Sequence, residues 1–228
     1  MMALWKNAPA VTILLAINIL LFLPYFINPP LFETILNNFG LYYFHSSQFK
    51  FYQIITHAFV HASLPHIAFN MFALLMFGGQ LEYLWKTKRF LIFYLITGLG
   101  AAFLHQAVSA FEIYQISGSI MPDGNSTILS GLTSAQYSDL QFKYFVPIVG
   151  ASGAIYGLLL GYAVLFPDAK LIFLLLPVPV KAKYLIPVLM VVELFLGVRQ
   201  FSFDNIAHFA HIGGALFGFI LVKLWSRK

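Results

Sequence analysis

A series of apolar stretches, each about as long as a bilayer is thick, constrains this chain more than any other feature. They recur along the whole sequence and are separated by short segments that carry prolines and lysines. Of the 228 residues, 60% are hydrophobic and only 9% are charged. Soluble domains carry about 25% charged residues, whereas a membrane-spanning helix needs about 20 mostly apolar ones. We therefore predict an all-α integral membrane protein.

The chain length accommodates about six spans with short connections and leaves no room for a second domain of ordinary size. We expect a single domain over residues 1–228, built as a six-helix transmembrane bundle. The predicted spans are residues 10–27, 64–85, 90–111, 147–166, 184–198 and 206–225.

Three connecting segments have a distinct character. Residues 31–63 are too polar to span and too apolar for a free loop, so we expect an element embedded in the headgroup region. Residues 112–143 are the most polar part of the chain and are expected outside the membrane. Residues 171–180 are apolar but short and broken by Pro177 and Pro179, so they are expected to lie against the surface.

The lysines and arginines predict which side of the membrane holds the termini. With an even number of spans, both termini lie on one side, and only Lys50, Lys143 and Arg199 of the 13 cations fall on the other. The positive-inside rule places the cation-rich side in the cytoplasm. Because the cations lie at helix ends, they indicate loop anchors and no nucleic-acid partner. Cysteine is absent, which excludes disulfides, thiol catalysis and cysteine-bound zinc.

Ser152 stands between Gly150 and Gly153 at the start of the fourth predicted span. A hydroxyl at the start of a bilayer-crossing run is costly without a use, which indicates a serine nucleophile just below the membrane surface. Gly153, Gly157 and Gly161 also indicate a close helix–helix contact, because small residues spaced four apart let membrane helices approach. The two interpretations are compatible.

Polar residues from three predicted spans share one depth. Ser152 opens the fourth span, and His211 lies a few residues into the sixth. His66 and Asn70 occupy the first turns of the second span and, being four residues apart, share one helix face. At ~1.5 Å per residue, these side chains lie about 5 to 12 Å below the outer surface. We predict that they form one site.

The chemistry that this group indicates is nucleophilic. A serine hydroxyl is inert at neutral pH until a base takes its proton, and histidine titrates in the right range for that work. His211 is the predicted base, because Gly214 and Gly218 let its helix close on the glycine-lined face of the fourth span. Tyr156, one turn below Ser152, is expected to stack on the His211 ring.

An acyl-transfer reaction also needs hydrogen-bond donors for the oxyanion. The Asn70 amide, the His66 ring and the backbone N–H of Ser152 are expected to supply them. No carboxylate is placed at this depth near His211, although Glu193 lies within the fifth span, where it is expected to face inward in its protonated form. A Ser-His dyad is therefore predicted in place of a triad.

Structural roles are expected for the other polar residues considered. They are His57, His61, His208 and Glu82, of which Glu82 is predicted to bond loop backbone near the cytoplasmic end of the second span.

Three separated motifs resemble those of the rhomboid family of intramembrane serine proteases. Gly150-Ala151-Ser152-Gly153 is similar to the family's GxSG motif around the nucleophile. Residues 210–218 resemble its AHxxGxxxG motif, and residues 61–70 resemble its HxxxxHxxxN motif. The resemblance implies that Ser152 is the nucleophile and His211 the base, with His66 and Asn70 in the oxyanion hole. The residues expected to support the site are Gly150, Gly153, Tyr156 and Gly214.

The resemblance further implies six helices around a water-filled cavity that opens to the outside. Residues 31–63 would be the family's membrane-embedded loop. The fifth span and residues 199–205, with Phe201 and Phe203, would be the lateral gate and cap. Rhomboid proteases cleave transmembrane segments near their outer ends, so the implied partners are transmembrane protein substrates and membrane lipid. Where the family commonly has a Trp-Arg pair, this chain has Tyr52-Gln53. The compact prokaryotic form, in a prokaryotic inner membrane, is expected.

Three other functions compete with this interpretation. A small transporter would show paired carboxylates or broken helices repeated in two halves, and neither is evident. An intramembrane metalloprotease lacks its HExxH motif here, and His208 with His211 lacks a carboxylate partner, so no metal and no cofactor are expected. An inactive rhomboid-like binding protein is the third, and the presence of both Ser152 and His211 argues against it. The sequence leaves the oligomeric state open.

Overall fold

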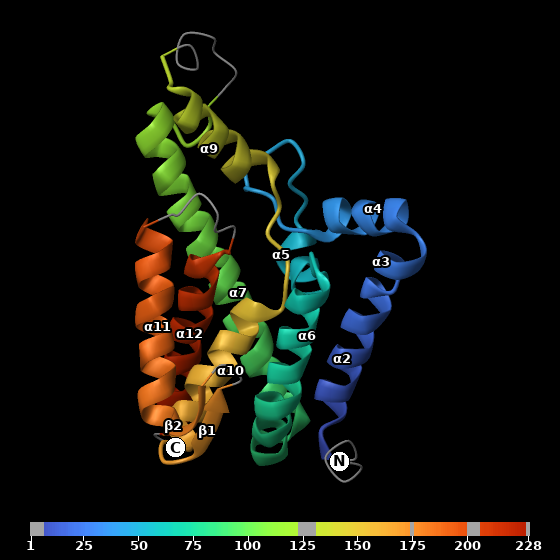
Figure 1. Ribbon diagram of the computed structural model, residues 1–228, viewed down its shortest axis with the longest axis vertical. Coiled ribbons are helices and arrows are strands. Elements are labelled where there is room, and N and C mark those ends of the chain that lie inside the picture. Colours follow the sequence, from blue (N-terminus) through green and yellow to red (C-terminus); the bar gives the residue numbers. More distant parts are fainter. Residues whose placement is uncertain (1–6, 123–130, 174–175, 200–205, 227–228) are drawn as a thin grey trace.

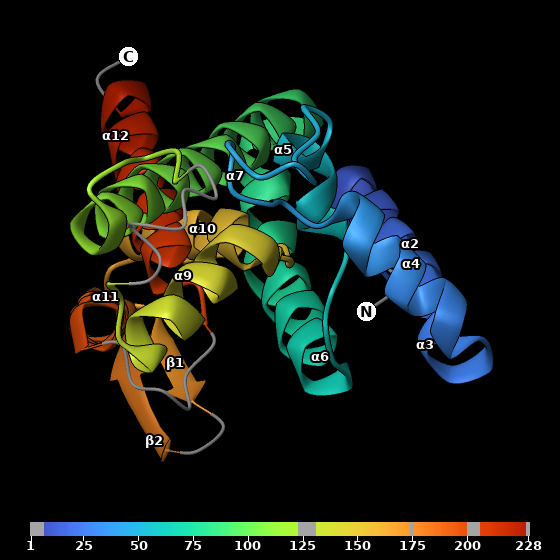
Figure 2. The same ribbon diagram turned by 90° about the horizontal axis from the view of Figure 1, so that it is seen from above.

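The computed structural model describes residues 7–122, 131–173, 176–199 and 206–226. Within these residues, three helical stretches are long and apolar enough to cross a membrane, namely Pro9–Ile27, Leu64–Ser117 and His208–Trp225. A shorter apolar helix, α10, covers Ser152–Leu165 and lies in the middle of the bundle (Figure 1, Figure 2). The expectation of a mainly helical bundle with several apolar helices is confirmed.

The first predicted span forms two helices, α2 (Pro9–Phe22) and α3 (Pro24–Ile27). A proline inside a helix has no N–H to donate, and its ring clashes with the carbonyl group four residues earlier. Pro24 therefore separates the two helices at Leu23. The prediction of one span from residue 10 to residue 27 holds, with a break near its end.

Glu82 fixes the start of α2. Its carboxylate is buried and accepts hydrogen bonds from the backbone N–H groups of Ala10 at 2.9 Å and Val11 at 2.8 Å. The first N–H groups of a helix have no partner within the helix, and a negative charge is favourable at that end. The backbone-binding role predicted for Glu82 is confirmed, with the first helix as its partner in place of a loop.

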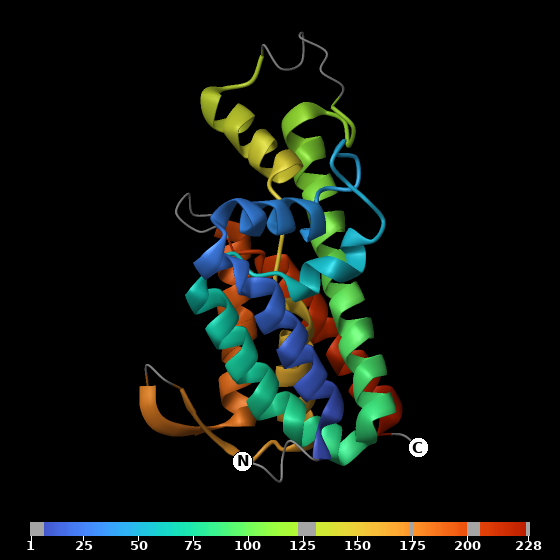
Figure 3. The ribbon, with the colours of Figure 1, turned by 90° about the vertical axis from the view of Figure 1, so that its right-hand side faces the viewer.

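The polar segment between the first two predicted spans, residues 28–63, is called the first connection. It begins with helix α4 (Pro29–Phe39), which lies across the bundle at one end, as Figure 3 shows. Helix α5 (Gln53–Thr56) follows. Gln53 anchors the connection although the family's Trp-Arg pair is missing. Its buried amide donates hydrogen bonds of 3.2 Å to the carbonyl groups of Asn38 and Gln48 and accepts one of 2.9 Å from the N–H of Lys50.

The second and third spans are one long helical stretch that reverses at Lys86. Helix α6 (Leu64–Ala73) continues through a π-helical turn, Leu74–Gly78, into α7 (Gly79–Ser117). Lys86 leaves helical geometry with φ 65° and ψ 161°, which divides the stretch in two. Figure 1 shows that the end of this stretch that follows α6 turns back beside it as α7. This reversal lies between residues 85 and 90, where the sequence predicted the end of one span and the start of the next.

The most polar part of the chain, predicted as a connection over residues 112–143, is largely helical in the residues that the structure describes. The last turns of α7 and helix α9 (Ser134–Phe145) project beyond the level of α4 (Figure 1). Ile113 and Leu140 pack with Tyr43 of the first connection in a small second core. Burial, together with the neighbouring Tyr144, raises the pKa of Tyr43 to about 12. The extension thus packs against the first connection.

Helix α10 begins at Ser152 and not at residue 147 as predicted. The backbone of Ile148 instead exchanges two hydrogen bonds of 2.9 Å with Leu41 of the first connection. Gly150 then has a φ of +116°, a conformation that glycine adopts at little cost and other residues rarely adopt. Because an extended partner satisfies this backbone, the segment has no need of helical bonds. Ser152 is therefore the first residue of its helix.

The expectation of an all-α fold is wrong in one place. Residues 171–173 and 176–180 belong to a two-stranded antiparallel hairpin of β1 (Lys170–Phe173) and β2 (Leu176–Lys181), in which Leu171 pairs with Val180. Proline is tolerated in edge strands, and both strands of a two-stranded hairpin are edges. Next to the hairpin, the ammonium groups of Lys183 and Lys181 lower the pKa of Asp168 to about 2.

Helices α11 (Ala182–Arg199) and α12 (His208–Trp225) complete the bundle. The predicted gate and cap residues Phe201 and Phe203 lie outside the described residues. The start of α2, the end of α12 and the hairpin lie together at one end of the bundle (Figure 1). The first residue of α2 and the last residue of α12 therefore lie at the same end of the bundle, as expected for an even number of spans.

Candidate active site

Ser152 and His211 are in contact. The Oγ atom of Ser152 lies 2.8 Å from the Nε2 atom of His211. Ser152 is the first residue of α10, and His211 lies one turn into α12. A histidine at this distance can take a hydroxyl proton. The contact that the sequence predicted between two residues 59 positions apart is present.

Glycines let α10 and α12 touch backbone to backbone. A Cβ atom at Gly214 would overlap the carbonyl oxygen of Gly153, and one at Gly218 would lie 2.8 Å from the carbonyl oxygen of Gly157. A Cβ atom at Gly153 would overlap the methyl group of Ala101 on α7. The close helix–helix approach predicted from the spacing of small residues is confirmed.

Tyr156 stacks on the imidazole of His211, as predicted. The ring centroids are 4.1 Å apart and the ring planes differ by 7°. Tyr156 lies four residues after Ser152 on the same helix face, so one face of α10 presents both the hydroxyl and the ring that covers His211. The stacking restricts rotation of the imidazole.

Glu193 corrects the expectation that no carboxylate lies near His211. Its Oε2 atom lies 2.9 Å from the Nδ1 atom of His211, on the opposite side of the ring from Ser152. The same oxygen lies 2.6 Å from the Nδ1 atom of His208, and the Tyr156 hydroxyl donates a hydrogen bond to Oε1. The Glu193 carboxylate is thus within hydrogen-bonding distance of three side chains, those of Tyr156, His208 and His211. Ser152, His211 and Glu193 have the connectivity of a triad.

The same residue corrects the statement that His208 and His211 lack a carboxylate partner. Sequence reasoning missed it because α11 is apolar on nearly every side, so its pattern does not say which face meets α12. An isolated ionisable residue in a predicted membrane span is itself the signal that could have identified Glu193, since such residues almost always face the interior of a bundle.

His66 and Asn70 lie beside the backbone that leads into Ser152. A Cβ atom at Gly150 would be 2.5 Å from Nε2 of His66 and 3.8 Å from Nδ2 of Asn70. One hydrogen of the Asn70 amide is donated to the carbonyl oxygen of His66 at 3.0 Å. The second hydrogen is left for another acceptor on this side of the site.

Two histidines of the first connection hold the segment before Ser152. The N–H of Gly150 donates to the carbonyl oxygen of His57 at 2.8 Å, and the N–H of Ala151 donates to Nε2 of His61 at 3.4 Å. The Nδ1 atom of His57 lies 2.9 Å from the carbonyl oxygen of Gln53, and these contacts agree with the structural roles expected for His57 and His61. The helix α10 begins directly after this segment, at Ser152, and the first N–H groups of a helix have no partner within the helix.

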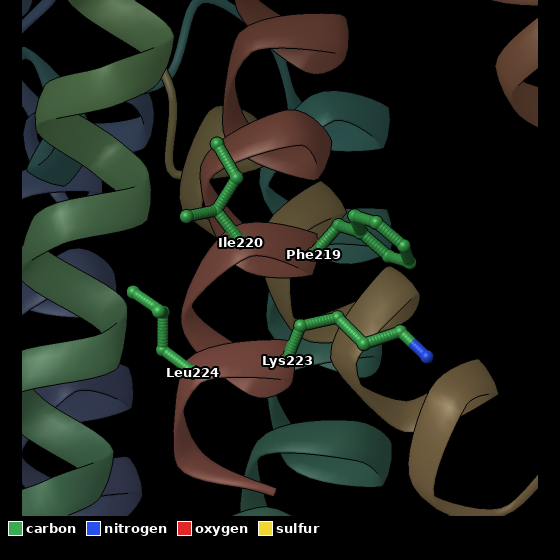
Figure 4. A pocket seen from close by; sticks show the side chains of 4 residues that line it. All are labelled: Phe219, Ile220, Lys223 and Leu224. Carbon is green, nitrogen blue, oxygen red and sulfur yellow. The ribbon is translucent and has the colours of Figure 1, made fainter. Parts of the chain in front are cut away.

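A cavity of about 20 Å³ adjoins Ser152, which is enough for about one water molecule. The lining residues are His57, Ala58, Gly98, Ala101, Ile148, Val149, Gly150, Ser152, Gly153, Ala154, Ala207 and Ala210. A larger open hollow of about 450 Å³ lies on the last turns of α12, where Figure 4 shows Phe219, Ile220, Lys223 and Leu224. Its mostly exposed apolar lining is typical of a lipid-facing surface, and it contains none of the predicted site residues.

Comparison with known proteins agrees with these motifs. Residues 48–228 match the Rhomboid domain family. The mitochondrial Rhomboid protein 1 of Saccharomyces cerevisiae is 33% identical over 168 residues, which are 72% of this chain and 39% of that protein. An uncharacterized mitochondrial rhomboid protein of Schizosaccharomyces pombe is 23% identical over 207 residues, covering 78% of this chain and 53% of that protein.

The chain therefore spans about half or less of the length of these two relatives. Both are named as mitochondrial proteins, which does not fit the expectation of a prokaryotic inner membrane. The family match covers most of the chain and includes Ser152, His211, His66, Asn70 and Glu193. This chain belongs to the rhomboid family and is an integral membrane protein.

Proposed function

We propose that this chain is an intramembrane serine endopeptidase that cleaves transmembrane segments of other membrane proteins. The observation that carries the proposal is the contact between Ser152 and His211, whose imidazole is held by Glu193 on its other side. Membership of the rhomboid family supports the same activity. We further propose six spans, with both termini in the cytoplasm. They are Pro9–Ile27, the two arms of Leu64–Ser117 on either side of Lys86, and the helices α10, α11 and α12. The cations of the hairpin and of the reversal at Lys86, at the end shared by both terminal helices, support this orientation.

In the proposed first step, Nε2 of His211 takes the proton of the Ser152 hydroxyl as Oγ attacks the scissile carbonyl carbon. The resulting oxyanion accepts hydrogen bonds from the N–H groups that open α10 and from the side chains of His66 and Asn70. His211 then donates its proton to the leaving amine, and the C–N bond breaks. A water molecule, for which the cavity beside Ser152 has room, hydrolyses the acyl-enzyme with His211 again as base.

A labelling experiment tests this proposal. The purified protein is incubated with a fluorophosphonate probe, and a second sample is incubated with a substrate that carries one transmembrane segment with small residues near its outer end. We expect the probe on Ser152, identified by peptide mass spectrometry, and cleavage within the transmembrane segment. Labelling of Ser152 without cleavage of any tested segment would favour a binding module, and no labelling would reject serine chemistry.

Glu193 is proposed as a positioning residue for His211. Its oxygen accepts the Nδ1–H, which leaves Nε2 free to take the serine proton and stabilises the imidazolium that forms. We expect Glu193→Gln to lower kcat about 10²- to 10⁴-fold with little change in KM. Glu193→Asp should restore part of the loss, and Glu33→Gln, at an exposed position, should have no effect. A rise in KM with kcat intact would contradict the positioning role.

A further inference from the structure

Glu193, His208 and His211 form a compact set of metal-binding side chains. One ligand atom from each lies within 4.8 Å of the other two. Two imidazole nitrogens and one carboxylate oxygen are the ligand set that zinc uses in many of its three-ligand protein sites. His208 and His211 are three residues apart on α12 and therefore present their rings on one side of the helix.

The arrangement of these side chains suits a metal ion. Both Nδ1 atoms already point at one oxygen of Glu193, at 2.6 and 2.9 Å. The other carboxylate oxygen is held by the Tyr156 hydroxyl, which is the kind of outer contact that orients a metal-binding carboxylate. All three side chains are at most 12% exposed, so their positions are constrained by packing.

We infer that Zn²⁺ binds to Glu193, His208 and His211 and thereby switches off the proposed protease. Zinc would be held by the two Nδ1 atoms and by the carboxylate, with water as the fourth ligand. A neutral histidine that gives its Nδ1 lone pair to a metal carries its proton on Nε2. In His211 that proton would face Ser152, so the ring could no longer take the hydroxyl proton. The metal thus stabilises the inactive tautomer.

Zinc binding requires only the three side chains, whereas the inhibition rests on the proposed serine mechanism. The two are separated by the Ser152→Ala variant, which keeps all three ligands and cannot perform serine chemistry. Chelator-treated Ser152→Ala is titrated with Zn²⁺ in competition with a chromophoric chelator. The same titration is carried out on the double variant Ser152→Ala/His208→Gln. The matched control is Ser152→Ala/His45→Gln, which removes a histidine of the first connection instead of a proposed ligand.

We expect one equivalent of zinc on Ser152→Ala and on its His45→Gln control. The His208→Gln change should weaken binding at least about 10-fold. The folding of each variant is checked by its thermal unfolding midpoint. If the His208→Gln variant does not fold, His211→Gln replaces it and is expected to weaken zinc binding by a similar factor. Equal affinity in all of these variants would overturn the proposed site.

The inhibition is tested on the wild-type protein. Saturating Zn²⁺ should slow fluorophosphonate labelling at least about 10-fold, and excess chelator should restore the original rate. Tight binding to Ser152→Ala with no effect on wild-type labelling would overturn the inhibitory role. If the chelator-treated protein were instead inactive and regained cleavage with zinc, the serine mechanism would fail while the binding site remained.

Discussion

Replacing Ser152 with alanine is expected to abolish both substrate cleavage and fluorophosphonate labelling. The hydroxyl oxygen is the only atom lost, and it is the one that lies 2.8 Å from the proposed base. Removing the nucleophile of a serine hydrolase costs about 10⁴-fold or more in kcat, so cleavage should fall below detection. The measurement is the initial rate of cleavage of a transmembrane substrate in proteoliposomes, with the thermal unfolding midpoint as the check on folding.

The base assignment predicts that His211→Gln causes a loss of the same order. Because the two residues act as a unit, the double variant Ser152→Ala/His211→Gln should be no slower than either single variant. His45→Gln serves as the control, since His45 lies in the first connection and outside the proposed site. Multiplicative losses in the double variant, or cleavage by Ser152→Ala at the wild-type rate, would show that another nucleophile acts.

The contact between Ser152 and His211 could be predicted because it follows from depth and from small residues. Both lie near the outer ends of helices that run in the same direction, and the glycines of α10 and α12 indicate that these helices touch. The stacking of Tyr156 follows from helical spacing alone. Local spacing and bilayer geometry were therefore sufficient for these three side chains.

Glu193 could not be placed by the same reasoning. Depth alone does not decide whether a side chain meets its neighbour, because the rotation of each helix about its own axis must also be known. A clear polar face would show which side of the helix faces the bundle interior, but α11 has no such face. The result was the wrong prediction that no carboxylate lies near His211, although an ionisable residue in a predicted span was visible in the sequence.

Two local structures depend on partners that the sequence pattern does not reveal. The segment before Ser152 reads as part of an apolar helix, yet it is extended because Leu41 pairs with Ile148 from a distant part of the chain. The hairpin of β1 and β2 contains two prolines, which count against a strand unless it is known to be an edge. Pairing between distant segments decides both cases.

Gly214→Ala is expected to inactivate the protein although it adds only one methyl group and no polar change. The new Cβ atom would overlap the carbonyl oxygen of Gly153, the residue that follows Ser152. That oxygen belongs to the backbone and cannot move away as a side-chain tip can, so α10 and α12 must separate locally. A misplacement of about 1 Å between reacting groups costs about 10²-fold in rate. Overpacking should also lower the free energy of unfolding by about 1–3 kcal/mol.

The matched control for this prediction is Gly161→Ala, on the face of α10 that carries Gly153 and Gly157 but farther from Ser152. The atoms nearest to its Cβ atom would be side-chain atoms, with the ring tip of Phe93 at 3.1 Å and a methyl group of Val222 at 3.3 Å. These atoms can shift by a few tenths of an ångström, so cleavage should stay within a few-fold of the wild-type rate. Cleavage and labelling are compared below the lower of the two unfolding midpoints. If Gly214→Ala cleaved as fast as Gly161→Ala, the spacing of α10 and α12 would not control the contact between Ser152 and His211.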